Sequence, residues 1–130
     1  MNETNKQKIG KTGENAAEMF LKKQSYRILE RNYWKKWGEI DIVADRNGII
    51  HFIEVKTVSR ENIPEAGSDD YLPEDNIHPW KRQRLSRAVQ TYLLERRISE
   101  DRDWQIDSLA VYLNKNGEVL KVDHLEDIIL

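Results

Sequence analysis

The chain has 130 residues, carries 21 Lys and Arg against 23 Asp and Glu for a formal net charge of −2, and contains no cysteine. Its length suffices for one domain with a single core over residues 1–130, and the lack of cysteine excludes disulfides and thiolate metal sites. The charge argues against an indiscriminate nucleic-acid coat protein, and without a membrane-length apolar run or a signal peptide we expect a cytoplasmic protein.

The first predicted element is an amphipathic helix over residues 8–24. Small and apolar residues recur there at helical spacing: Ile9, Gly13, Ala16, Ala17, Phe20 and Leu21. Glu14 falls close to Ala17 and Leu21 on the helical wheel, so its carboxylate is expected at the edge of the buried stripe. An unpaired charge is costly in that position, which makes Glu14 a candidate site residue. A capping or solvated acid is the alternative.

Three predicted strands follow, over residues 26–33, 39–45 and 49–57. The second and third strands are largely apolar in their middles, which is the pattern of a sheet covered on both faces. The polar exceptions are Asp41, His51, Glu54 and Lys56. Since side chains alternate along a strand, Glu54 and Lys56 share one face, and His51 falls on the other face as a structural or surface residue.

Asn47-Gly48 predicts a two-residue hairpin turn between the second and third strands. Counting outward from that turn pairs Asp41 with Glu54, and Glu39 with Lys56. Two carboxylates directly opposite each other repel, and a divalent cation such as Mg²⁺ would offset the repulsion. A three-residue loop would turn Asp41 to the other face, and a salt-bridged triad of Asp41, Glu54 and Lys56 is the structural alternative.

A flexible loop is predicted over residues 58–79, because the segment contains prolines and a glycine and has no periodicity. Pro79 then favours the start of a second helix. Four cations fall in the first turns of this helix, where they oppose the helix dipole: Lys81, Arg82, Arg84 and Arg87. An anionic partner is the simplest explanation for their position.

The chain is predicted to end with a fourth strand over residues 105–113, an Asn116-Gly117 turn, a short strand over 119–122 and a last turn that closes the core. Asp107 on the fourth strand is interpreted as a structural acid. The order of helix, three strands, helix and strand, followed by a further strand, predicts an α/β fold. Its mixed sheet would carry helices on both faces.

Charges are segregated along the chain. Residues 1–36 carry nine Lys or Arg against four acids, residues 81–97 carry six against one, and residues 61–75 carry six acids and no base. Such segregation can steer a polyanion, although each basic segment alone is more simply a solvated face. Lys35 and Lys36, interleaved with aromatic residues at the end of a hairpin, are candidates for gripping a nucleic-acid strand.

Four stretches resemble the PD-(D/E)XK nuclease superfamily, and more closely its YraN-like family, proposed endonucleases related to archaeal Holliday junction resolvases. They are GENAA at residues 13–17, YRILERN at 26–32, GEIDIVA at 38–44 and FIEVKT at 52–57. With the second helix and the fourth strand, the resemblance covers nearly the whole chain. An Asp followed by Glu-x-Lys is a weak pattern alone. It is strong on a hairpin that is preceded by a helix bearing Gly-Glu.

The resemblance implies a restriction-endonuclease-like αβββαβ core, with a mixed central sheet flanked by helices. It implies that Asp41, Glu54 and Glu14 are catalytic and hold Mg²⁺ or Mn²⁺, and that Lys56 positions or activates the attacking water. The reaction would be hydrolysis of DNA phosphodiester bonds, on branched or damaged DNA in repair or recombination. The residues expected to contact nucleic acid are Lys81, Arg82, Arg84, Arg87, Lys35 and Lys36.

Two departures from the related families and two alternative functions accompany this hypothesis. The acidic loop over 61–75 is longer than the usual connection, and Gln83 is followed four residues later by Arg87 rather than by the Tyr of RecB-like nucleases. The chain could be a non-catalytic nucleic-acid-binding module that keeps the nuclease fold, or a protein-interaction domain using the acidic loop. Duplex, branched or single-stranded DNA and a homodimer all remain open.

Overall fold

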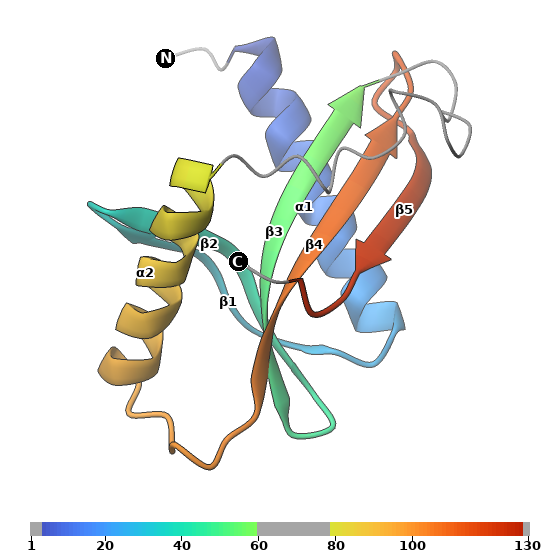
Figure 1. Ribbon diagram of the computed structural model, residues 1–130. Helices are drawn as coiled ribbons and strands as arrows, with labels where there is room; N and C mark the ends of the chain where they lie inside the picture. Colours follow the sequence, from blue (N-terminus) through green and yellow to red (C-terminus); the bar gives the residue numbers. More distant parts are fainter. Residues whose placement is uncertain (1–3, 60–78, 129–130) are drawn as a thin grey trace.

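The computed structural model describes residues 4–59 and 79–128, and Figure 1 shows the arrangement of their helices and strands. The acidic stretch over 61–75 lies outside the described residues, as does nearly all of the loop predicted over 58–79. The predicted αβββαβ order is confirmed and a fifth strand follows it. The elements are α1 (Asn5–Lys23), β1 (Arg27–Lys35), β2 (Gly38–Arg46), β3 (Ile49–Ser59), α2 (Pro79–Glu95), β4 (Trp104–Leu113) and β5 (Val119–Leu125).

The strands form one mixed sheet in the order β1-β2-β3-β4-β5. Strands β3 and β4 are parallel, and the other neighbouring pairs are antiparallel. A parallel pair needs a crossover connection, and here the crossover includes α2. Figure 1 shows α1 and α2 on opposite sides of the sheet. Neither described helix is long and apolar enough to cross a membrane.

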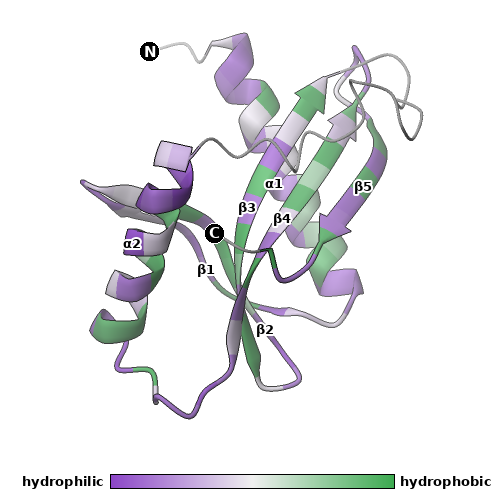
Figure 2. Ribbon diagram, viewed as in Figure 1, coloured by the Kyte–Doolittle hydropathy of each residue, from purple (hydrophilic) through white to green (hydrophobic). Residues whose placement is uncertain are grey.

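Each face of the sheet has its own hydrophobic core. Under α1, Ala17 and Leu21 pack with residues of the central strands, including Ile53. Under α2, Leu85 and Val89 pack on the opposite face. Hydrophobic residues run along the central strands in Figure 2, as expected for a sheet covered on both sides.

Strand β2 changes face at Asp41. Ile42 and Ala44 pack beneath α1, whereas Ile40 packs beneath α2, although regular alternation would keep Ile40 and Ile42 on the same face. The neighbouring strand is irregular at the same level, where Asn32 of β1 has a left-handed φ of 52°. The β1–β2 hairpin therefore twists at this point.

The register predicted from the Asn47-Gly48 turn is confirmed as far as the pair Ile42 and Ile53. The ladder ends there, because the backbone N–H of Val55 donates to Oδ2 of Asp41 at 2.7 Å. The backbone pairs expected of Asp41 with Glu54, and of Glu39 with Lys56, are therefore not part of this ladder. A side chain has replaced the main-chain partner of Val55.

Two glycines allow both helices to approach the hairpin closely. A Cβ atom on Gly13 of α1 would lie 1.8 Å from Oγ1 of Thr57, and one on Gly38 of β2 would lie 2.2 Å from the carbonyl oxygen of Arg84. Any larger residue would have to push the helix away. These contacts fix α1 and α2 against the strands that carry Asp41 and Glu54.

Candidate active site

Asp41 and Glu54 are buried carboxylates on neighbouring strands, with 8% and 5% of their surfaces exposed. Burial, followed by the charge of Glu54, raises the pKa of Asp41 to about 8, while the hydrogen bond from Val55 acts in the opposite direction. The charges of Glu14 and Glu39 make smaller contributions to the same rise. These acids thus interact electrostatically, and in the metal-free protein burial and repulsion favour the neutral form of Asp41, whereas a bound cation would favour its ionised form.

Lys81, in the first turn of α2, faces Glu54. Its Nζ lies 2.5 Å from Oε1 of Glu54. Burial lowers the pKa of Lys81, but the hydrogen bond to Glu54 and the charges of Glu54 and Asp41 outweigh burial, and the pKa is raised. Lys81 was expected to contact nucleic acid, and the structure places it within the carboxylate site.

Lys56 lies two residues after Glu54 on β3 and is partly buried. Strand alternation puts the two side chains on the same face of the sheet. The Lys56 ammonium makes no hydrogen bond or ion pair with any residue in the described part of the chain. Among the described residues, Lys81 rather than Lys56 is therefore the cation that neutralises Glu54.

Glu14 approaches the site from α1 but pairs with Arg31 of β1. Its Oε1 lies 3.4 Å from Nη2 of Arg31, and the Glu14 side chain is 24% exposed. Nη1 of the same arginine donates to Oδ1 of Asn15 at 2.8 Å. Glu14 also borders a shallow pocket of about 460 Å³ beside Asn32, and its charge contributes to the raised pKa of Asp41.

A cleft of about 430 Å³ opens beside Glu54. Acidic, basic and aromatic side chains from β2, β3 and α2 line it: Glu39, Glu54, Trp80, Lys81, Arg84 and Leu85. Its volume is in the range of small-ligand sites. The cleft combines carboxylates suited to a hard cation with ammonium and guanidinium groups suited to a phosphate.

The other predicted nucleic-acid contacts do not gather at one place. Arg87 lies one turn beyond the cleft, with its guanidinium 5.8 Å from the ring centre of Trp37. Lys35 is 2.6 Å from Oε2 of Glu95, at the far end of α2. Arg82 borders a separate pocket with Pro79 and neighbouring residues of α2, and Lys36 is exposed at the β1–β2 turn. Only Lys81 and Arg84 of this predicted set line the cleft.

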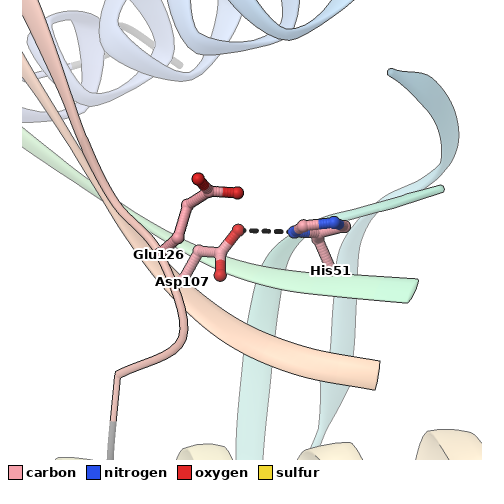
Figure 3. A group of neighbouring side chains, drawn as sticks. All are labelled: His51, Asp107 and Glu126. Atoms are coloured by element: carbon pink, nitrogen blue, oxygen red, sulfur yellow. Dashed lines mark hydrogen bonds and ion pairs between the residues drawn. The ribbon is translucent and has the colours of Figure 1, made fainter. Parts of the chain in front are cut away.

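A second polar cluster lies on the opposite face of the sheet and includes His51, Asp107 and Glu126 (Figure 3). Asp107 is fully buried, and its Oδ2 is 2.7 Å from Nδ1 of His51 and 2.8 Å from Nε2 of His124. Its Oδ1 accepts hydrogen bonds of 2.9 Å from the Gln105 side chain and the Asp127 backbone.

This second cluster could hold a metal ion, since His51, Asp107 and Glu126 offer ligand atoms that all lie within 4.8 Å of one another. However, the hydrogen bonds of Asp107 already account for the arrangement of this cluster without a metal. Burial alone would raise the pKa of Asp107, but its hydrogen bonds, led by the one from His124, lower the pKa below the ordinary range. The predicted structural role of Asp107 fits this geometry, whereas His124 was not singled out from the sequence.

The unfolding of the metal-free protein should depend on pH through Asp41. Its folded pKa of about 8 exceeds the ordinary value of about 4, so the folded state holds the proton more tightly. The resulting stability is fully present below about pH 4 and is lost as pH rises through about 8. With chelator present, we expect the midpoint of thermal unfolding to fall by roughly 4 °C or more between about pH 5 and about pH 9. Asp41→Asn should reduce that slope, and an equal slope in both proteins would contradict the assignment.

Removing the Lys81 charge should strengthen metal binding at the carboxylates. A cation competes with the Lys81 ammonium for Glu54, and a charged hydrogen bond at a half-exposed side chain is worth about 1 kcal/mol. We therefore expect Lys81→Gln to lower the Mn²⁺ dissociation constant about fivefold by titration calorimetry. Arg87→Gln, which makes the same charge change one turn beyond the cleft, is the control. Equal or weaker Mn²⁺ binding by Lys81→Gln would refute the competition.

Comparisons with known proteins show a consistent similarity. A family model described as "Uncharacterised protein family UPF0102" matches residues 13–111, a range that includes the carboxylates and Lys81. A UPF0102 protein of Flavobacterium johnsoniae is 38% identical over 121 residues, which cover 92% of this chain and 91% of that protein. One from Alkaliphilus oremlandii is 38% identical over 92% of this chain and 96% of its own length. One from Flavobacterium psychrophilum is 40% identical over 92% of this chain and 91% of its own length.

Proposed function

The chain belongs to the uncharacterised protein family UPF0102, and we propose that it is a metal-dependent endonuclease that hydrolyses DNA phosphodiester bonds in the cytoplasm. One observation carries the proposal: two buried carboxylates on neighbouring strands, Asp41 and Glu54, interact electrostatically, and Glu54 lines a cleft that also contains basic side chains. The order of elements agrees with a nuclease core, although fold alone does not establish activity.

The donor groups fit Mg²⁺ or Mn²⁺. Carboxylate oxygens are the ligands that hard divalent cations prefer, and no cysteine competes for a softer metal. The raised pKa of Asp41, caused first by burial and then by the charge of Glu54, is a further argument, because a bound cation would offset both effects and favour the ionised carboxylate. Asp41 and Glu54 would hold the ion, with Glu14 contributing from α1. When bound, the ion would polarise the phosphate and activate water.

The basic residues of the chain have complementary roles in this proposal. Lys56, on the same sheet face as Glu54, orients the attacking water or adds positive charge beside the phosphate. Lys81 neutralises Glu54 in the metal-free protein and would turn to a phosphate oxygen once a cation takes its place. Arg84, which lines the cleft, binds a neighbouring phosphate.

A non-catalytic DNA-binding module is the second candidate. The ion pair between Lys81 and Glu54 favours it, since a neighbouring ammonium already neutralises one of the carboxylates without a metal. In such a module, binding would fall steeply with salt concentration and no divalent metal would support cleavage.

The test is a cleavage panel with the purified full chain. Labelled single-stranded, duplex, nicked and branched DNAs are incubated with Mg²⁺, with Mn²⁺ or with chelator. The endonuclease proposal predicts internal cleavage of at least one DNA that requires the metal and stops with chelator. Salt-dependent binding without cleavage under any condition would favour the binding module.

A further inference from the structure

The cleft beside Glu54 has one wall that the proposed hydrolysis does not use. This wall is the indole of Trp80, in the first turn of α2, and 56% of the residue is exposed. The guanidinium of Arg84, one helical turn further on, lies 6.0 Å from the centre of the Trp80 ring. A large aromatic surface thus stands next to a candidate phosphate-binding group and in the same cleft as a candidate metal ligand.

A second pair of the same kind lies one turn further along α2. Arg87 lies 5.8 Å from the ring centre of Trp37, whose Nε1 donates to Oγ1 of Thr91 at 3.1 Å. Aromatic rings and guanidinium groups therefore follow the helix away from the carboxylates. Proteins that bind single strands use the same combination of aromatic surfaces for bases and cations for the backbone.

We propose that Trp80 stacks on an unpaired base next to the scissile phosphate. The substrates would then be DNAs with unpaired nucleotides, such as single strands, flaps and bubbles, rather than uninterrupted duplex. This inference rests on the proposed function, because it names the class of DNA that the same cleft would accept.

The argument for unpaired nucleotides is steric and energetic. In a duplex, both faces of each base are already stacked on neighbours, and exposing one face costs a few kcal/mol except where pairing is already lost. An indole in the wall of a cleft can stack only on a base that is free to enter the cleft. Stacking tolerates any base, so no sequence preference is expected from this contact.

The test measures DNA binding by fluorescence anisotropy with the full chain in chelator, so that no cleavage intervenes. The ligands are a labelled single strand, the matching duplex and the same duplex with a central unpaired bubble. Trp80→Leu should raise the dissociation constant for the single strand and the bubble about tenfold, a loss within the range for one stacked base. The duplex should change less than about twofold, and Trp80→Phe should retain most of the affinity.

Trp104→Leu is the matched control, because Trp104 is 40% exposed but packs on Phe52 and does not line the cleft. It should leave all three affinities unchanged, and circular dichroism verifies that each variant is folded. An unchanged single-strand affinity in Trp80→Leu, an equal loss for duplex, or no binding by the unmodified protein would overturn the stacking site. If the Trp80 effect is present but no metal supports cleavage, the hydrolysis proposal fails while stacking stands.

Discussion

Asp41→Asn and Glu54→Gln should each reduce Mn²⁺-supported DNA cleavage about 10³-fold. A bound cation contributes about 4 kcal/mol of charge stabilisation in the transition state, and each factor of ten in rate corresponds to about 1.4 kcal/mol. Each substitution removes one charged ligand but keeps the size of the side chain. Each change removes a charge from the buried pair, and Gln at position 54 keeps an oxygen that can accept a hydrogen bond from Lys81, so neither change should unfold the metal-free protein. Single-turnover cleavage of a labelled oligonucleotide measures the effect.

Asp45→Asn provides the control for this loss. Asp45 lies on the same strand but pairs with Arg27 at 3.2 Å and with Arg102 at 3.1 Å, away from the cleft. Its substitution should leave cleavage within about twofold, since neither pair involves a residue that lines the cleft. Full activity in both Asp41→Asn and Glu54→Gln would place the reaction elsewhere or attribute the cleavage to a contaminant.

Asp107→Ala should lower the free energy of unfolding by about 3–5 kcal/mol, because it leaves several buried hydrogen-bond donors unpaired at about 1–3 kcal/mol each. The carboxylate accepts hydrogen bonds from two histidines, a glutamine and the Asp127 backbone, and the substitution leaves those donors buried without an acceptor. Because these groups belong to β3, β4, β5 and the segment after β5, the loss affects one whole side of the sheet. Urea unfolding followed by circular dichroism measures it.

Asp123→Ala on β5 is the comparison for Asp107→Ala. Asp123 pairs with Lys121 at 3.3 Å, and both side chains are partly exposed, at 25% and 31%. Such a pair is worth about 0–1 kcal/mol. If the two alanine variants lose similar stability, Asp107 is not the organising centre of the cluster.

Local patterns predicted most of the fold. The Asn47-Gly48 turn determines the register of β2 and β3 as far as Ile42 and Ile53, because a two-residue hairpin leaves no freedom in the count. The apolar stripe of α1 likewise predicts which side of the helix is buried. The helix begins at Asn5, before the predicted start at residue 8, because a capping box between Thr4 and Gln7 stabilises its first turn.

Contacts between segments that lie far apart in the sequence could not be predicted from such local patterns. Lys81 meets Glu54 only because α2 crosses the sheet beside Gly38, and nothing in the spacing of the two residues indicates this. His51, Asp107 and His124 come together through the parallel pairing of β3 with β4 and the return of β5. The only sequence signal for this cluster is that His51 and Asp107 are isolated polar residues in apolar strands. His124 does not lie in such a strand.

Counting residues along a regular strand also could not predict the change of face at Asp41. A strict two-residue period keeps Ile40 with Ile42, whereas the chain twists where Asn32 is left-handed and where the Asp41 side chain accepts the Val55 N–H. This irregularity is a departure from ideal strand geometry at the candidate site. Such departures concentrate at functional sites, where local preference gives way to the position of a reacting group.

Mn²⁺ binding followed by electron paramagnetic resonance tests the central claim most directly, because it asks which cluster holds the ion. The chain offers a matched pair of substitutions: Glu54→Gln beside Asp41, and Glu126→Gln in the cluster with His51 and Asp107. We predict that the unmodified protein and Glu126→Gln bind Mn²⁺ alike and that Glu54→Gln loses at least about tenfold in affinity. Loss of binding in Glu126→Gln with full binding in Glu54→Gln would contradict the account.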